Sequence, residues 1–433
     1  MKGKEKQSRA GPYYKWWVVL LLWFVCFLNY ADRQAISSVL PLLGADFGFS
    51  AVQLALIASA FAWVYAGAAP VAGLAADRFP RKGLIIAACS FWSLFTFATA
   101  QCGGLWMLVG TRALTGLGEA FYFPAAMALV SDYHGGRTRS RAIALHQSGV
   151  YAGTILGSWL AAELAQRHGW RSPFYLFGPV GFLLAAVLLF SLREPRRGAA
   201  ENSSPAEERT LSLRESWRAI ARMPAVWLLM GAFFLANFVA VIFLTWTPTF
   251  LVEKFHYTVG SAGLNGTIFI HLASALSVVL AGCLADWLSH RFVGGRMQVQ
   301  FAGLLAGSVC VFWVGTADTK LTLMLAMICF GLCKGVYDSG IFASLYDCIE
   351  PRARGAAAGL MNMVGWGGGA LGPLFVGYAT TYGHQSSKTE NMSQSIAWSA
   401  VFYLAAAALM AAAWTVYARQ IKGASPPPCH PAS

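Results

Sequence analysis

The chain has 433 residues, of which 57% are hydrophobic and only 12% are charged. A soluble globular protein carries about 25% charged residues, so this composition excludes the soluble enzymes and soluble binding modules. The formal charge of +13 would suit a nucleic-acid partner, but the basic residues lie in short loops between long apolar stretches, and this placement argues against nucleic acid.

A bilayer core about 30 Å thick needs about 20 apolar residues per helix, and the sequence has twelve such stretches. We predict an all-α membrane protein in which these stretches are transmembrane helices. The first stretch is too long for a cleavable signal peptide and is interrupted by Asp32 and Arg33. The predicted helices are residues 17–41, 51–76, 83–101, 105–132, 140–165, 173–192, 225–250, 262–287, 298–317, 321–347, 355–380 and 396–417.

Every second loop is rich in Lys and Arg, whereas the loop between the first two helices has none. The positive-inside rule therefore places both termini in the cytoplasm, and we expect an integral protein of the cell's inner membrane. The basic loops also add some attraction to the anionic lipids of the bilayer.

A polar segment at residues 193–222 is predicted to be a cytoplasmic linker between two six-helix bundles, residues 1–192 and 223–433. The two halves also resemble each other in sequence. An offset of 215 residues places Gly116 over Gly331 without a gap, and it places Lys334 under Glu119. Such repeats are common in transporters, whose substrate site lies near mid-membrane where the halves meet. We therefore predict two pseudo-symmetric bundles around a central site.

Five ionisable residues interrupt the predicted helices: Asp32, Arg33, Arg112, Glu119 and Lys334. Charges inside a bilayer are costly and usually mark a solute or proton pathway. Arg112 and Glu119 are seven residues apart, hence on one helix face but about 10 Å apart along the axis. Each therefore needs another partner, and the first helix is the natural candidate. The alternative is a static salt-bridge network that only fixes helix packing.

Other polar and aromatic residues in the predicted helices can have either a structural role or a role in a binding site. Lys334 and Asp338 are close enough to pair within one helix, and this pair is either structural or part of a site. His146 and His271 are interpreted as hydrogen-bonded packing residues, although a histidine can relay protons. The repeat places Gln147 opposite Asn362. The aromatic residues expected to line a pocket are Trp63, Tyr65, Tyr122, Tyr151, Tyr337 and Trp366.

Sites of other kinds are not indicated by the sequence. Cys329 and Cys333 are four residues apart, but no histidine or acidic residue completes a metal set. There is no phosphate-binding loop and no arrangement typical of an enzyme. We expect no cofactor, no metal and no enzymatic activity.

The segment GLAADRFPRK at residues 73–82 resembles the loop signature of the major facilitator superfamily, G-x-x-x-D-R-x-x-R-[KR]. A weaker copy, GCLADWLSHR at residues 282–291, places Asp286 opposite Asp77. The resemblance implies the twelve-helix fold of that superfamily and alternating access. The residues that it assigns to gating and structure are Gly73, Asp77, Arg78, Arg81, Lys82 and Asp286.

A narrower resemblance is to the anion:cation symporters, through NYADR (29–33), SAFAWVY (59–65), TRALTGLGEAFYFP (111–124) and FLTWTPTFL (243–251). It implies proton-coupled transport of a small organic anion such as a carboxylate or sugar acid. Arg33 would bind the substrate carboxylate, Asp32 and Glu119 would carry protons, and Arg112 would be the partner of Glu119. The residues expected to complete the substrate site are Tyr30, Tyr65, Tyr122, Gln147, Tyr151, Lys334, Tyr337, Asn362 and Trp366.

The sequence departs from the sugar-acid carriers in two places. Tyr151 and Trp366 stand where those carriers often have polar side chains, which predicts a more aromatic pocket. NYADR and FWSL (91–94) also resemble the spinster-type lipid transporters, so a lysolipid or other amphiphile is an alternative substrate. A membrane receptor without transport is a second alternative. Family likeness implies a monomer.

Overall fold

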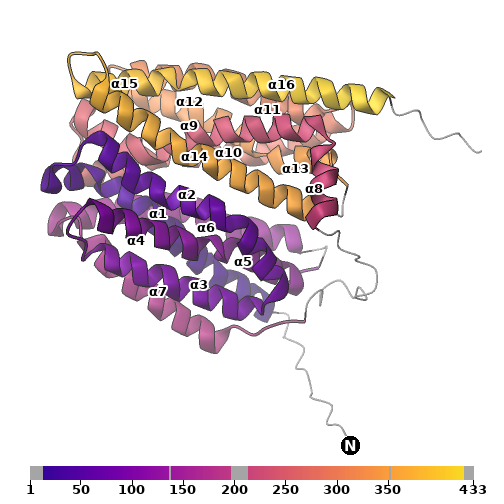
Figure 1. Cartoon of the computed structure of the whole chain (residues 1–433), viewed down its shortest axis with the longest axis horizontal. Coiled ribbons are helices and arrows are strands. Elements are labelled where there is room, and N and C mark those ends of the chain that lie inside the picture. The colour runs from indigo at the N-terminus through magenta and orange to yellow at the C-terminus, as the bar shows by residue number, and fades with distance from the viewer. Residues whose placement is uncertain (1–12, 136–137, 197–212, 351–352, 424–433) are drawn as a thin grey trace, which may run out of the picture.

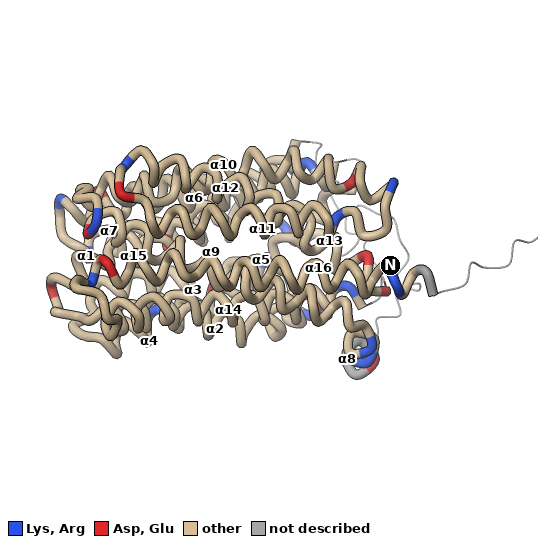
Figure 2. Tube along the Cα trace, turned by 90° about the horizontal axis from the view of Figure 1, so that it is seen from above, with Lys and Arg blue, Asp and Glu red and all other residues tan. Residues whose placement is uncertain are grey.

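The computed structural model describes residues 13–135, 138–196, 213–350 and 353–423. All regular secondary structure in these ranges is helical. The long helices run side by side, with the N-terminal half and the C-terminal half forming two adjacent groups (Figure 1). Lys, Arg, Asp and Glu concentrate at the two ends of the helices and are sparse between them (Figure 2), as expected for helices that cross a bilayer.

The N-terminal bundle consists of α1 (Tyr14–Phe47), α2 (Ala51–Arg78), α3 (Arg81–Thr99), α4 (Leu105–Ala120), α5 (Tyr122–Tyr133), α6 (Arg139–His168) and α7 (Ser172–Ser191). The C-terminal bundle consists of α9 (Pro224–Phe255), α10 (Val259–Ser289), α11 (Gly295–Thr316), α12 (Lys320–Asp338), α13 (Ile341–Asp347), α14 (Arg354–Tyr382), α15 (Lys388–Trp398) and α16 (Ala400–Gly423). The short helix α8 (Leu213–Ala221) lies within the predicted linker, of which residues 197–212 fall outside the described residues.

Ten spans are long and apolar enough to cross a membrane, if α4–α5, α12–α13 and α15–α16 are each counted as one span. The helices α6 and α14 complete the predicted twelve, since they have 30 and 29 residues. Both are rich in glycine and other small residues, which lowers their hydropathy but lets neighbouring helices approach closely. The twelve-helix membrane fold expected from the sequence is therefore confirmed.

Two of the spans are broken at corresponding places in the repeat. The helix breaks at Phe121 in the N-terminal half and at Ser339–Gly340 in the C-terminal half. Pro124 contributes to the first break because it lacks the N–H that would bond to the Ala120 carbonyl. Each break follows shortly after an intramembrane charge, so Glu119 and Lys334 lie near the end of a helical segment.

The bundles approach each other closely at the end away from the basic loops. A Cβ added at Gly263 of α10 would lie 2.7 Å from the Ser158 carbonyl oxygen of α6, and one at Gly377 of α14 would lie 2.7 Å from the Ala51 carbonyl oxygen of α2. At the basic end, a Cβ at Gly73 or Gly282 would meet no described atom within 4 Å. The tight glycine contacts between the bundles therefore lie at the end away from the basic loops.

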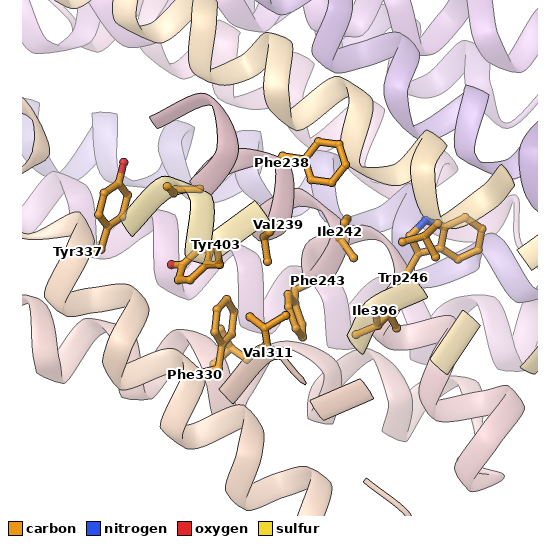
Figure 3. Close-up of a cluster of buried hydrophobic side chains, with 14 of the residues drawn as sticks. Phe238, Val239, Ile242, Phe243, Trp246, Val311, Phe330, Tyr337, Ile396 and Tyr403 are labelled. Atoms are coloured by element: carbon orange, nitrogen blue, oxygen red, sulfur yellow. The ribbon is translucent and has the colours of Figure 1, made fainter. Parts of the chain in front are cut away.

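The core of the C-terminal bundle is built around α9, as Figure 3 shows. Phe243 stacks on Phe330 of α12 with ring centroids 4.5 Å apart. The Trp246 indole N–H donates to the Pro373 carbonyl of α14 at 3.1 Å. Apolar burial of this kind fixes α9 against its own bundle, so the bundle can act as a rigid unit.

Close packing inside the N-terminal bundle depends on glycine at the α1–α6 contact. A Cβ at Gly153 would lie 2.3 Å from the Phe27 carbonyl oxygen. We predict that Gly153→Ala lowers the free energy of unfolding by about 1–3 kcal/mol, because the helices must separate. The matched control is Gly83→Ala, where the new Cβ would meet no atom within 4 Å. Tryptophan fluorescence during unfolding in detergent measures both, and equal stability of the two variants would contradict the prediction.

Candidate functional site

A buried ion pair joins α1 to α4. The Arg33 Nε lies 2.5 Å from the Glu119 Oε2, and the side chains are 10% and 0% exposed. The two charges neutralise each other in a region where a lone charge would be very costly. Family likeness assigned Glu119 to Arg112, whereas the seven-residue spacing pointed to Asp32 or Arg33 of the first helix; the structure brings Arg33 into direct contact with Glu119. Arg112 lies two helical turns away on the same helix as Glu119.

Four aromatic rings surround the Arg33 guanidinium. Its central carbon lies 4.7 Å from the ring centroids of Tyr30 and Tyr65, 5.0 Å from Phe61 and 5.2 Å from Trp366. These are favourable cation–π distances. Trp366 belongs to α14 of the C-terminal bundle, and its ring lies 4.9 Å from the Tyr65 ring. The guanidinium is therefore enclosed by residues of both bundles. Phe61 was not among the expected site residues; it belongs to the same SAFAWVY segment as Tyr65.

Asp32 and Arg112 are also buried in the N-terminal bundle, close to the Arg33–Glu119 ion pair. Asp32 is fully buried and accepts a hydrogen bond from the Thr96 hydroxyl of α3 at 3.3 Å. Arg112 is 2% exposed, lies 5.1 Å from the Phe61 ring, and interacts electrostatically with both Asp32 and Glu119. The four charges of the N-terminal bundle thus form one cluster of two cations and two carboxylates.

Four polar atoms of this cluster are buried without a hydrogen-bond partner among the described residues: Asp32 Oδ1, Arg33 Nη1, Arg112 Nε and Glu119 Oε1. A buried, unsatisfied polar atom costs about 1–3 kcal/mol, and more when it is charged. Such atoms concentrate where a protein exchanges partners during its function. The cluster therefore retains hydrogen-bonding capacity for a bound anion or a proton.

A second polar group lies in the C-terminal bundle. Lys334 and Asp338 form an ion pair along α12. Lys334 also lines a small cavity together with His271 of α10 and apolar side chains of α9 and α12. The Tyr151 ring of α6 lies 6.4 Å from the His271 ring, so the N-terminal bundle reaches this group as well.

Not all expected site residues join these two groups. The Tyr122 hydroxyl donates to the Leu22 carbonyl at 2.7 Å and contacts His146 at 2.8 Å, inside the N-terminal bundle. Tyr337 is 2% exposed within the core of the C-terminal bundle. The Tyr122 hydroxyl is thus satisfied inside its own bundle, whereas the Tyr337 hydroxyl is buried without a hydrogen-bond partner among the described residues. Gln147 and Asn362 are half-buried and make no side-chain hydrogen bond to a described residue, which leaves them available to a ligand.

The loop after α2 forms a set of polar contacts at the basic end. Arg81 forms a salt bridge with Asp132 of α5, and the backbone N–H groups of Arg81 and Lys82 donate to the Glu194 carboxylate at 2.9 and 2.6 Å. The Lys82 ammonium donates to the Leu189 carbonyl at 2.8 Å. These bonds hold α3, α5 and the end of α7 together. Gly73, Asp77 and Arg78 lie at the end of α2, with Asp77 and Arg78 exposed.

The C-terminal bundle repeats this arrangement. Arg296 forms salt bridges with Asp286 at 2.8 Å and with Asp347 at 2.7 Å. Sequence reasoning singled out Asp286 but missed Arg296. The offset of 215 residues places Arg296 under Arg81 and Asp347 under Asp132, so the repeat held the signal. It was hidden because the segment from Asp286 to Arg296 is six residues longer than the segment from Asp77 to Arg81, which shifts the local alignment.

The fold and these two charged groups define a polytopic membrane protein with a polar centre between two helix bundles. The sequence matches the profile of the Major Facilitator Superfamily over residues 22–373 and 273–428. The chain therefore belongs to the major facilitator superfamily of transporters, and it is not an enzyme.

Individual relatives agree with this assignment. The chain is 30% identical over 395 residues to "Probable anion transporter 4, chloroplastic" of Oryza sativa subsp. japonica, a match covering 86% of this chain and 65% of that relative. It is 25% identical over 403 residues to the "Probable galactarate/D-glucarate transporter GudP" of Escherichia coli (strain K12), covering 86% and 88%. A solved bacterial homologue of the human lysosomal transporter Spinster, inward-facing and unoccupied, shares the fold with a TM-score of 0.83 at 22% identity, covering 94% and 98%.

The two salt-bridge sets at the basic end differ in burial, and this difference predicts different effects on stability. Arg81 and Asp132 are 11% and 7% exposed, whereas the partners of Arg296 are 65% and 35% exposed. We predict that Arg81→Gln lowers the free energy of unfolding by about 3 kcal/mol, because it removes the guanidinium that pairs with a buried carboxylate. Arg296→Gln should cost about 0–1 kcal/mol. Denaturation in detergent measures the free energy of unfolding of both variants. A larger loss of stability in Arg296→Gln than in Arg81→Gln would contradict the prediction.

Proposed function

We propose that this transporter moves a small organic anion, a carboxylate or sugar acid, by symport with protons. The observation that carries the proposal is the buried Arg33–Glu119 ion pair inside an aromatic enclosure shared by both bundles. An arginine is the preferred partner of a carboxylate because its planar fork presents paired donors. The names of the anion and sugar-acid transporters among the relatives support the same substrate class.

The coupling follows from competition for Arg33. While Glu119 is ionised it occupies the guanidinium, and an incoming anion finds no free charge. When Glu119 takes up a proton, Arg33 becomes available to the substrate carboxylate, and total charge in the cluster is unchanged. Release of the proton restores the ion pair and expels the anion. Asp32, buried beside Arg112, is proposed as the second protonation site.

The arrangement of the bundles suits alternating access. The close glycine contacts between them lie at the end away from the basic loops. We propose that the basic loops and both termini are cytoplasmic, so that the structure is an inward-facing state in the inner membrane, and that the monomer is the transport unit. Substrate bound between Arg33 and Trp366 would draw the bundles together at the basic end. The polar contacts of Arg81 and Arg296 stabilise each bundle at that end.

Arg33 is expected to supply most of the anion affinity. Charge-assisted hydrogen bonds contribute about 1.5–3 kcal/mol each, and tenfold in affinity corresponds to about 1.4 kcal/mol. We predict that Arg33→Gln weakens binding by about 10- to 100-fold. A thermal-shift screen of purified protein with carboxylates, sugar acids, amino acids and lysolipids identifies the ligand, and titration then compares the variant. Lysolipid binding that survives Arg33→Gln would favour an amphiphile transporter instead.

Glu119→Gln separates coupling from binding. Glutamine cannot exchange the proton, so we predict that anion exchange between the two sides continues while uphill accumulation driven by a pH gradient is lost, falling by about tenfold or more. Asp32→Asn should behave in the same way. The assay is flux in liposomes with an imposed pH gradient, and Glu253→Gln, at an exposed carboxylate of α9, is the control. Uphill uptake retained by either variant would show that the replaced residue is not a proton carrier. Ligand binding without any flux in the wild-type protein would indicate a receptor instead of a transporter.

A further inference from the structure

The Lys334–Asp338 pair has little structural purpose. Its two members are four residues apart on α12, so the pair lies along one helix and links no two helices. A pair of this kind adds little to helix stability. A lysine at membrane depth with only 17% of its side chain exposed is nevertheless costly to keep. The cost points to a ligand-directed role for this charge.

Three hydrogen-bond donors converge beside this pair. The Lys334 ammonium and the His271 imidazole line the same small cavity, whose other walls are apolar side chains of α9, α10 and α12. Tyr151 reaches the group from α6, with its ring 6.4 Å from the His271 ring, and interacts electrostatically with both Lys334 and Asp338. An ammonium, an imidazole and a phenol together are well suited to an anionic group.

A hydrogen bond from Gln34 links the helix that carries Arg33 to a residue that lines this cavity. Gln34 follows Arg33 on α1, and its side-chain N–H donates to the Leu244 carbonyl of α9 at 2.6 Å. Leu244 lines the cavity that holds Lys334. The α1–α9 contact therefore links the helix that carries Arg33 to the wall of the cavity that holds Lys334.

The charges of the two groups balance. Arg33 and Arg112 face Asp32 and Glu119, and Lys334 faces Asp338. Each cation therefore has a carboxylate with which a ligand must compete. Because Asp338 competes for Lys334 in the same way that Glu119 competes for Arg33, the C-terminal bundle holds its own unit for exchanging anions.

We propose that Lys334, His271 and Tyr151 form a second anion subsite, and that the transported solute carries two anionic groups, one for each bundle. This inference rests on the function proposed above and names its substrate class: a dianion. One end pairs with Arg33 of the N-terminal bundle and the other with Lys334 of the C-terminal bundle. A solute held by both bundles would couple substrate occupancy directly to their relative movement.

The test uses two matched pairs of probes that differ in one carboxylate. Galactarate is compared with galactonate, and adipate with 6-hydroxyhexanoate, by titration of the purified full chain. The readout is the ratio of dianion to monoanion affinity, which we expect to be about tenfold or more in at least one pair. Lys334→Met should bring this ratio to about one. Asp338→Asn should raise it, because the ligand no longer competes with a carboxylate for Lys334. Lys254→Met, at another partly buried lysine of the C-terminal bundle, is the control.

A structural ion pair would give a different pattern. Both Lys334→Met and Asp338→Asn would then lower the unfolding temperature and weaken all probes alike, and the double variant would recover both properties. That pattern overturns the subsite, as does a wild type that prefers neither dianion or binds neither. If the dianion and the monoanion of each probe pair bind equally, and Arg33→Gln weakens both, the proposal of a second subsite is contradicted. The proposed transport of organic anions is then still supported. If no anion in the wider screen binds, both fail.

Discussion

The high cost of an unpaired charge in a low-dielectric membrane interior governs this structure. Arg33 cannot lie at that depth alone, so it pairs with Glu119 and is surrounded by aromatic rings. Under the proposed function, the same constraint would make the pair a switch, since any anion that binds Arg33 must displace the carboxylate or find it protonated. Binding and proton exchange would then be linked by the same electrostatic requirement.

The enclosure of Arg33 shows how the two bundles share one site. Tyr30, Phe61 and Tyr65 come from the N-terminal bundle, and Trp366 comes from α14 of the other bundle. Close contacts through Gly263 and Gly377 hold the bundles together at the end away from the basic loops. A site that takes side chains from both bundles responds to their relative tilt, and this is the geometric requirement of alternating access.

Much of the polar site could be anticipated because intramembrane charges are rare and therefore conspicuous. Asp32, Arg33, Arg112 and Glu119 do form one cluster, and seven-residue spacing correctly implied that Arg112 and Glu119 need other partners. The pairing itself could not be read, because helix periodicity fixes the face of a side chain but not the rotation of one helix against another. Tyr122 illustrates the same limit: its aromatic ring and its depth in the membrane suggested a pocket residue, yet its hydroxyl contacts Leu22 and His146 inside the N-terminal bundle.

The sequence by itself determined the class of protein, the twelve spans, the internal repeat and the small set of charges that matter, because hydropathy and charge placement follow directly from residue chemistry. Only the tertiary structure decided that Arg33 is the ion-pair partner of Glu119, that Trp366 closes the aromatic enclosure, and that Arg296 rather than an arginine nearer to Asp286 completes the second salt-bridge set. These outcomes depend on how helices distant in sequence rotate and pack against one another, and no local pattern encodes that geometry.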